Sequence, residues 1–310
     1  ANNIGMEKFE INILGCGSAT PTPLHNPSSQ VINFRDNLMM IDCGEGTQRM
    51  MRKMKLRFSR LNHIFISHMH GDHCLGLPGL LSTLGLHERT GTVTVHLPAE
   101  GVDIMRRMAD FFVRQPSFEL VFEPIEGSGG RIFTSDSLTV DAFPLYHRVP
   151  CYGFLFRETA KLRHLRGDMV AFHQIPVSAL HGIKCGDDYV KPDGEVIVNE
   201  MLTRPADRSR SYAYCSDTQA DERVARAVSG VDLLYHEATY ADELAVQAHE
   251  RGHSTAGEAG RIAAEAGARR LMIGHYSKRY TDSALLAAEA CRTFGGEVIA
   301  AQEGLKIELQ

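Results

Sequence analysis

Short apolar runs alternate with amphipathic stretches along most of the chain. Residues 9–14 alternate and then meet Gly15 and Gly17, which predicts a strand entering a turn. The pattern predicts further strands at residues 30–34, 38–41, 64–67, 93–97, 118–122, 138–144, 152–156, 211–215, 232–235, 270–273, 297–300 and 305–309. It predicts helices at residues 45–55, 75–86, 101–112, 220–228, 255–266 and 283–293. Strand-rich runs with helices between them favour an α/β fold in which two sheets lie between helix layers.

Residues from about 157 to 205 interrupt this succession of predicted strands and helices, because they are polar, rich in charge and glycine, and only weakly periodic. Strand and helix patterns resume after them, so we expect an inserted arm rather than a linker. The 310 residues are therefore expected to form a single domain, residues 1–310, that carries this arm.

Composition and charge narrow the class of protein. No apolar run reaches 18 residues, so we expect no membrane span. The seven cysteines are scattered and never form a C-x-x-C pair, which favours reduced thiols in a cytoplasmic enzyme. The net charge of −5 argues against an extended nucleic-acid surface. Two local clusters are basic, and for either one alone we favour a solvated face over a phosphate contact: Arg49, Arg52, Lys53, Lys55, Arg57 and Arg60, and Arg157, Lys161, Arg163 and Arg166.

The clearest chemical signal follows the predicted strand at residues 64–67. His68, His70, Asp72 and His73 lie within six residues. Imidazole and carboxylate are ligands of catalytic zinc, manganese and iron. Side chains two apart point the same way on an extended backbone, and Gly71 permits a turn that sends the next pair elsewhere. The run therefore predicts a metal centre at the carboxyl end of a strand.

Three more candidate ligands lie farther along the chain. His147, Asp217 and His275 each come just after a predicted apolar strand, so they can meet at one sheet edge. The remaining histidines are more often surface or core residues than ligands, and we assign no role to His25, His87, His96, His164 and His181.

These motifs resemble the metallo-β-lactamase superfamily and, within it, the ribonuclease Z family. The resemblance covers nearly the whole chain. It rests on residues 15–23 and 26–29, on Asp42-Cys43-Gly44-Glu45-Gly46-Thr47-Gln48, on residues 67–81 with their Gly-Leu-Pro-Gly-Leu-Leu end, and on the segments that begin at His236, His253 and His275. It implies an α/β fold, a four-layer αββα metallo-β-lactamase-like sandwich with a small inserted exosite arm.

The resemblance also implies a division of labour among the site residues. His68, His70 and His147 would hold one Zn²⁺, and Asp72, His73 and His275 a second, with Asp217 bridging the two Zn²⁺ of each subunit. Mn²⁺ or Fe²⁺ would accept the same ligands. Asp72 would also accept a proton, His253 would act as the general acid, and Glu237 would orient His253. Asp42 is expected to support a ligating histidine.

The function implied by the resemblance is removal of the 3′ trailer from precursor tRNA by a homodimer, leaving a tRNA 3′-hydroxyl and a trailer 5′-phosphate. One departure concerns the arm. Family members often carry a Gly-Pro pair there, whereas this chain has Ser178-Ala179. This departure concerns the contact between the arm and tRNA and does not concern the metal site.

Two alternatives stay open at this stage. A binuclear phosphodiesterase, arylsulfatase or thioester hydrolase acting on a small molecule would suit the acidic charge and the altered arm. The motifs at His236 and His253 argue against a small-molecule hydrolase. A nucleic-acid-binding module with a structural metal is the other alternative, but structural zinc sites usually contain cysteine ligands, and this run has none.

Overall fold

The computed structural model describes residues 7–87, 89–113 and 116–310. These residues form two compact units. The main unit contains the described residues up to Thr134, together with Thr139–Phe156 and Ser211–Gln310, and the arm unit contains Ser135–Leu138 and Arg157–Arg210. None of the helices in the described ranges combines the length and the apolar character that a membrane crossing requires.

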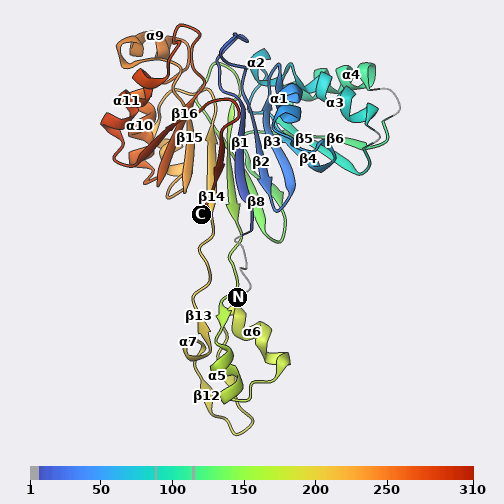
Figure 1. Cartoon of the computed structure of the whole chain (residues 1–310), viewed down its shortest axis with the longest axis vertical. Coiled ribbons are helices and arrows are strands. Elements are labelled where there is room, and N and C mark those ends of the chain that lie inside the picture. Colours follow the sequence, from blue (N-terminus) through green and yellow to red (C-terminus); the bar gives the residue numbers. More distant parts are fainter. Residues whose placement is uncertain (1–6, 88, 114–115) are drawn as a thin grey trace. The chain divides into compact units, whose positions relative to one another are not determined.

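The first sheet of the main unit is built from the N-terminal half of the chain and one late strand (Figure 1). Its order is β18 (Lys306–Glu308), β1 (Phe9–Gly15), β2 (Ser29–Phe34), β3 (Asn37–Cys43), β4 (Leu61–Phe65), β5 (Thr92–Pro98) and β6 (Glu119–Ile125). The pairs from β3 to β6 are parallel. Both faces of β2 are buried, as expected for a strand covered on both sides.

Apolar side chains of this sheet pack against three helices, α1 (Thr47–Lys53), α3 (Leu77–Leu86) and α4 (Val102–Phe112). Met51, Leu80 and Met105 contribute one buried side chain from each helix. This contact forms the outer helix layer on one side of the molecule.

The second sheet comes mainly from the C-terminal half. Its order is β17 (Glu297–Ala300), β16 (Arg270–Gly274), β15 (Leu233–Glu237), β14 (Ser211–Cys215), β9 (Tyr152–Glu158), β8 (Leu138–Pro144) and β7 (Gly130–Thr134). Strands β14 to β17 are parallel. The helices α8 (Glu222–Ala227), α10 (Ala256–Glu265) and α11 (Ala284–Thr293) belong to this half, and α10 and α11 pack against its strands.

Aromatic side chains join the two sheets. The ring of Phe65 lies 5.6 Å from that of Phe154 and 5.4 Å from that of Phe156, and Tyr214 Oη donates to Asp42 at 2.7 Å. The layer order is therefore helix, sheet, sheet, helix, and the predicted four-layer αββα sandwich is confirmed.

Several element bounds differ from the prediction. The predicted strand 64–67 is β4, which ends at Phe65, and the predicted helix 75–86 is α3, which begins two residues later, at Leu77. A separate short helix, α2 (Gly71–Cys74), precedes it and was not predicted. The two helices are separate because Gly76 N donates to Cys43 O at 2.8 Å, and Pro78 lies in the first turn of α3. The pattern missed β7 and α9 (Ala245–Glu250), which are short and contain few buried side chains.

The arm unit has a small core of its own. Ile175, Ile183, Ile197 and Leu202 are buried together. Around them lie α5 (Gly167–Phe172), α6 (Leu180–Cys185), α7 (Asn199–Leu202), the pair β10 (His164–Leu165) and β13 (Thr203–Arg204), and the pair β11 (Tyr189–Val190) and β12 (Val196–Ile197). A buried ion pair joins Glu158 Oε1 to Arg210 Nη2 at 2.6 Å. Ser178 and Ala179 lie in a short 3₁₀ turn, Val177–Ala179.

Gly76 and Gly79 give a matched test of the packing beside the histidine run. A Cβ at Gly76 would lie 2.2 Å from Gly44 O, whereas a Cβ at exposed Gly79 would lie 3.3 Å from the flexible end of Gln48. We expect Gly76→Ala to destabilise the protein by about 1–3 kcal/mol through overpacking. Gly79→Ala should change stability by at most about 1 kcal/mol, in the stabilising direction. Urea unfolding midpoints measure both, and equal midpoints for the two variants would contradict this packing.

Candidate active site

The structure brings all seven of the predicted metal ligands to one edge of the main unit. His68, His70, Asp72 and His73 follow β4, His147 follows β8, Asp217 follows β14 and His275 follows β16. The parallel pairs β3–β4 and β14–β15–β16 place their carboxyl ends together, so the loops after them meet. The side chains form two groups, His68, His70, His147 and Asp217, and Asp72, His73 and His275.

Asp217 lies between the two groups. Its Oδ2 atom is 3.7 Å from His68 Nε2 and 3.8 Å from His147 Nε2. Its Oδ1 atom is 3.3 Å from His73 Nε2 and 3.2 Å from His275 Nε2. Each carboxylate oxygen therefore faces a different group of imidazoles, which is the arrangement of a bridging ligand.

The distances among the ligand atoms fit a metal site. Ligand atoms at about 2.1 Å from a tetrahedral zinc are about 3.4 Å apart. His70 Nδ1 lies 3.0 Å from His68 Nε2 and 3.3 Å from His147 Nε2, and His73 Nε2 lies 3.3 Å from His275 Nε2. Both groups therefore have room for one ion each.

Hydrogen bonds behind the rings direct lone pairs toward the centre. An acceptor faces the Nδ1 atom of His68 (Ser67 Oγ, 3.0 Å), of His147 (Gly252 O, 2.7 Å) and of His275 (Thr239 Oγ1, 2.8 Å). A ring that donates through Nδ1 presents the lone pair of Nε2. These residues therefore fix the tautomer that a metal requires.

Asp42 supports His73 in the same way. Its fully buried carboxylate accepts hydrogen bonds from His73 Nδ1 at 2.7 Å, from Ser67 N at 2.7 Å, from Ser67 Oγ at 2.9 Å and from Tyr214 Oη at 2.7 Å. A supporting role for Asp42 was expected from the sequence, whereas no motif pointed to Tyr214.

The electrostatics favour a cation at the centre. Burial lowers the pKa of His68, His70 and His147, so these imidazoles stay neutral and able to bind a metal. Burial would also lower the pKa of His73, but the negative charges of Asp72, Asp217 and Asp42 raise it well above its usual value. The three carboxylates thus stabilise positive charge at this point, and a divalent cation would supply that charge in place of a proton.

His253 and Glu237 form a pair beside the metal ligands. Glu237 is fully buried, and its Oε1 atom accepts hydrogen bonds from His253 Nδ1 at 2.8 Å and from Thr218 N at 2.8 Å. Burial would lower the pKa of His253, but the Glu237 carboxylate outweighs it and raises this pKa to about 9. The contact with Glu237 therefore favours the protonated form of His253. Thr239 Oγ1 donates to Glu237 Oε2, so the same carboxylate also supports His275 through Thr239.

Asp72 is held by a backbone group that sequence reasoning missed. Ala19 N donates to Asp72 Oδ2 at 2.7 Å. Ala19, Asp42 and His275 are non-glycine residues with positive φ, of 65°, 54° and 62°. Such backbone strain persists only where surrounding contacts enforce it, and here all three residues lie at the site.

A further group lies outside this centre. Cys16, His25 and Glu303 have ligand atoms within 4.8 Å of one another. Glu303 Oε2 is 3.0 Å from His25 Nδ1, and Glu303 Oε1 accepts from Asn26 N at 2.9 Å, so Glu303 anchors the loop that contains Ala19. His25 thus has a hydrogen-bonded structural place, and no motif in the sequence pointed to Glu303.

Known proteins are similar to this chain over nearly its whole length. Residues 9–175 match the family model described as "Anti-Pycsar protein Apyc1", and residues 201–276 match the model described as "Beta-lactamase superfamily domain". Each model covers part of the chain. Curated relatives cover nearly all of it: a Bacteroides fragilis protein named "Ribonuclease Z" is 51% identical over 305 residues, 98% of this chain and 100% of the relative. The chain belongs to the ribonuclease Z family.

A second curated relative and two solved structures are also similar to this chain. A Parabacteroides distasonis protein of the same name is 50% identical over 98% of this chain and 100% of its own length. The crystal structure of the short form of human tRNase Z has a TM-score of 0.71 and 24% identity, covering 97% of this chain and 99% of that one. Unliganded yeast PDE1 has a TM-score of 0.60 and 12% identity, covering 98% and 100%. At these identities the two structures show the shared fold alone.

Asp42 and Tyr214 allow a test of metal binding that does not rely on activity. Asp42→Asn keeps the shape of the side chain, and asparagine tolerates the positive φ of this residue. The substitution replaces a carboxylate oxygen with an amide NH₂, which faces groups that themselves donate hydrogen bonds. We expect about a 10- to 100-fold loss of metal affinity, measured by competition with a chelating dye. Tyr214→Phe removes one donor and leaves the contact with His73, so its affinity should fall by less than about tenfold. Unchanged affinity in Asp42→Asn would refute the supporting role.

Proposed function

We propose that this chain is a metal-dependent endoribonuclease that removes the 3′ trailer from precursor tRNA. The observation that carries the proposal is the placement of Asp217 between two imidazole groups, in a chain 51% identical over nearly its full length to a protein named Ribonuclease Z. The products would be a tRNA with a 3′-hydroxyl and a trailer with a 5′-phosphate.

We propose two Zn²⁺ per subunit as the cofactors, with Mn²⁺ or Fe²⁺ as ions that the same ligands accept. His68, His70 and His147 would hold one ion, and Asp72, His73 and His275 the other, with Asp217 shared. When bound, the ions would lower the pKa of a water molecule and neutralise charge on the reacting phosphate. The ligand set includes no cysteine, which speaks against a purely structural metal.

Asp72 is the proposed proton acceptor. Its Oδ2 atom is fixed by Ala19 N. Burial would raise the pKa of Asp72, but the positive charge of His73 and a hydrogen bond from His275 outweigh this effect and lower it. An ionised carboxylate at this place can take one proton from the attacking water as the oxygen bonds to phosphorus.

His253 is the proposed general acid, with Glu237 as its positioning residue. The contact with Glu237 fixes Nδ1, so Nε2 is left to donate. As the bond between phosphorus and the tRNA 3′ oxygen breaks, that oxygen takes the proton from His253. The balance is one water consumed, one 3′-hydroxyl formed and one phosphate released on the trailer.

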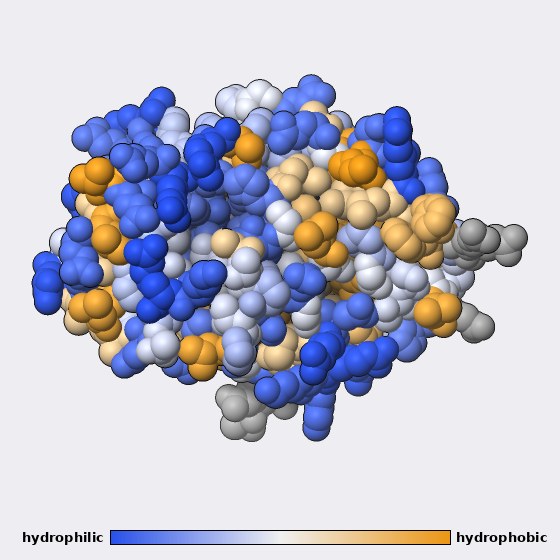
Figure 2. All heavy atoms as spheres, turned by 90° about the horizontal axis from the view of Figure 1, so that it is seen from above, coloured by the Kyte–Doolittle hydropathy of each residue, from blue (hydrophilic) through white to orange (hydrophobic). Residues whose placement is uncertain are grey.

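Three further properties belong to the proposal. A homodimer is supported by family membership and by exposed apolar side chains on α3 and α4, among them Leu86 at 83% and Phe111 at 65% exposure. Figure 2 shows hydrophobic side chains gathered over this part of the molecule. We further propose a cytoplasmic location, and a single domain of residues 1–310 in which residues 157–205 form the inserted arm that contacts tRNA.

A small phosphodiester as the natural substrate is the alternative, and the whole-chain relatives do not favour it. The fold shared with yeast PDE1 at 12% identity does not distinguish the two functions. A small diester is nevertheless useful as a probe, because p-nitrophenolate leaves as a stable anion and needs no general acid.

The test is single-turnover cleavage of a 3′-extended precursor tRNA by the zinc-loaded protein, with the cut mapped. We expect a cut directly after the discriminator base. His253→Ala should slow this cut by about 10²- to 10⁴-fold, because the leaving 3′ oxygen loses its acid. Asp72→Ala, which removes both a ligand and the proton acceptor, should lose at least as much.

Bis(p-nitrophenyl) phosphate provides the matched control. His253→Ala should hydrolyse it within roughly threefold of the unaltered protein, whereas Asp72→Ala should not. An equal loss on both substrates in His253→Ala would contradict the role of general acid. Brisk hydrolysis of the diester with no cleavage of precursor tRNA would overturn the proposed function and leave the metal centre standing.

A further inference from the structure

A cavity of about 310 Å³ opens beside His253. Among the described residues that line the cavity, no side chain is acidic and four are cationic: Arg148, Arg251, Lys278 and Arg279. His253 and Ala19 line the same cavity, so it adjoins both the proposed general acid and the loop that holds Asp72. Figure 2 shows hydrophilic side chains over the middle of this face.

Two of the cationic side chains are held in position by contacts with neutral residues. Arg251 Nη1 donates to Tyr240 Oη at 3.1 Å. Arg279 Nε donates to Ser277 Oγ at 3.2 Å, and its guanidinium lies 5.2 Å from the centre of the Tyr240 ring. Among the described residues, none of the four cations forms an ion pair with a carboxylate. Their charge is therefore left for an external anion.

We propose that this cavity, named here the cationic pocket, binds a backbone phosphate of the substrate on the tRNA side of the cleaved bond. The inference rests on the proposed function. His253 faces the leaving 3′ oxygen, which belongs to the tRNA and not to the trailer. A cavity that shares His253 therefore adjoins the nucleotide on that side, and the nearest anion there is the next phosphate upstream.

Arginine suits this task because its guanidinium donates to two phosphate oxygens at once. The neighbouring Tyr240 ring and the Ser277 hydroxyl hold Arg279 in place before the substrate arrives, so less side-chain entropy is lost on binding. The pocket would thus place the scissile phosphate against the metal ligands and distinguish a polynucleotide from a small diester.

Pocket variants of the full-length, zinc-loaded protein test the proposal on precursor tRNA. The double variant Arg251→Gln and Arg279→Gln should lower kcat/KM by about 10- to 100-fold, as expected for lost charge-assisted contacts. The slope of log kcat/KM against log salt should become shallower by about 0.7 for one phosphate. Hydrolysis of bis(p-nitrophenyl) phosphate, which has no neighbouring phosphate, should stay unchanged.

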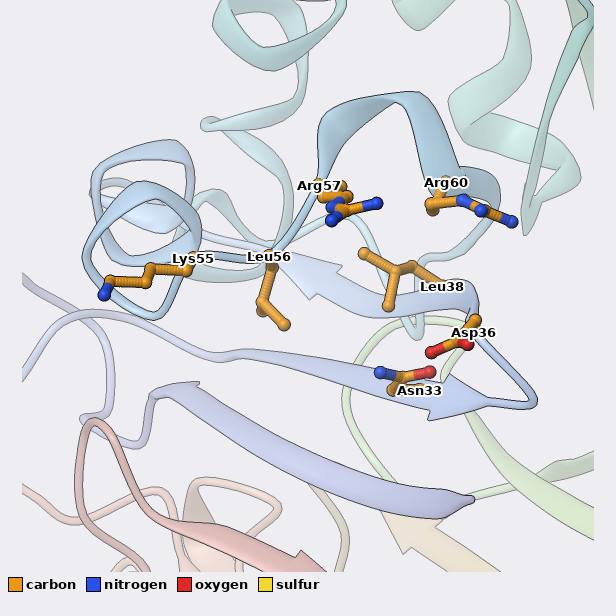
Figure 3. A pocket seen from close by; sticks show the side chains of 7 residues that line it. All are labelled: Asn33, Asp36, Leu38, Lys55, Leu56, Arg57 and Arg60. Carbon is orange, nitrogen blue, oxygen red and sulfur yellow. The ribbon is translucent and has the colours of Figure 1, made fainter. Parts of the chain in front are cut away.

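A second basic surface provides the matched control. Lys55, Arg57 and Arg60 line a separate cavity of about 280 Å³ near the start of β3 (Figure 3). Asp42 lies near the other end of that strand. Arg57→Gln and Arg60→Gln remove the same charge as the pocket variant. Cleavage of precursor tRNA should be unchanged in this control, and an equal loss would show general attraction and overturn the proposal.

A substrate with one neutral methylphosphonate locates the contact. Placed at the first phosphate upstream of the cut, the methylphosphonate should slow the unaltered protein but cause little further loss in the pocket variant. The same group at the second trailer phosphate should slow both proteins equally. Independent losses at the upstream position would overturn the proposal. If the unaltered protein does not cleave precursor tRNA at all, the proposed function fails instead, so the two failures are distinguishable.

Discussion

The buried carboxylate of Asp217 is the constraint on which the rest of the site depends. It is 3% exposed, and each of its two oxygens faces two of the four ligand imidazoles, with His253 Nδ1 3.9 Å from Oδ2 as well. A carboxylate removed from water is costly unless positive charge surrounds it. Burial works to raise its pKa, but His275, His73 and His68 outweigh this effect and lower it. The strand ends that carry these residues must therefore meet at one point, and two parallel sheet segments achieve that.

Backbone groups complete the site, and they do so through strained or tightly packed positions. Ala19, Asp42 and His275 have positive φ, and a Cβ at Gly252 would lie 2.8 Å from His147 Nδ1. Three of these positions put a polar group where a ligand needs it: Ala19 N on Asp72, Asp42 on His73, and Gly252 O on His147. The strain at Ala19 and Asp42 is held by the surrounding contacts, whereas Gly252 adopts its positive φ freely because it has no Cβ.

The predicted ligands that the structure brings together share a property. His68, His70, Asp72 and His73 are adjacent in the chain, and His147, Asp217 and His275 each follow an apolar strand. Strand ends can be read from apolar periodicity, so these residues could be expected to converge.

The missed parts act through other groups. Ala19 and Gly252 contribute backbone atoms, which leave no trace in residue type, and Tyr214 reaches Asp42 from a strand in the other sheet. The separation of α2 from α3 at Gly76 could not be predicted either, because it depends on the close approach of Gly44 from another segment. The arm is weakly periodic because its helices are short and its core consists of a few side chains such as Ile183 and Leu202.

Anomalous diffraction from crystals of the zinc-loaded protein, measured at the zinc absorption edge, tests the central claim most directly. The account predicts two peaks per chain, about 3.5–4 Å apart, on either side of the Asp217 carboxylate. One peak should contact His68, His70 and His147, and the other Asp72, His73 and His275. A single peak, or zinc bound only at Cys16, His25 and Glu303, would contradict the account.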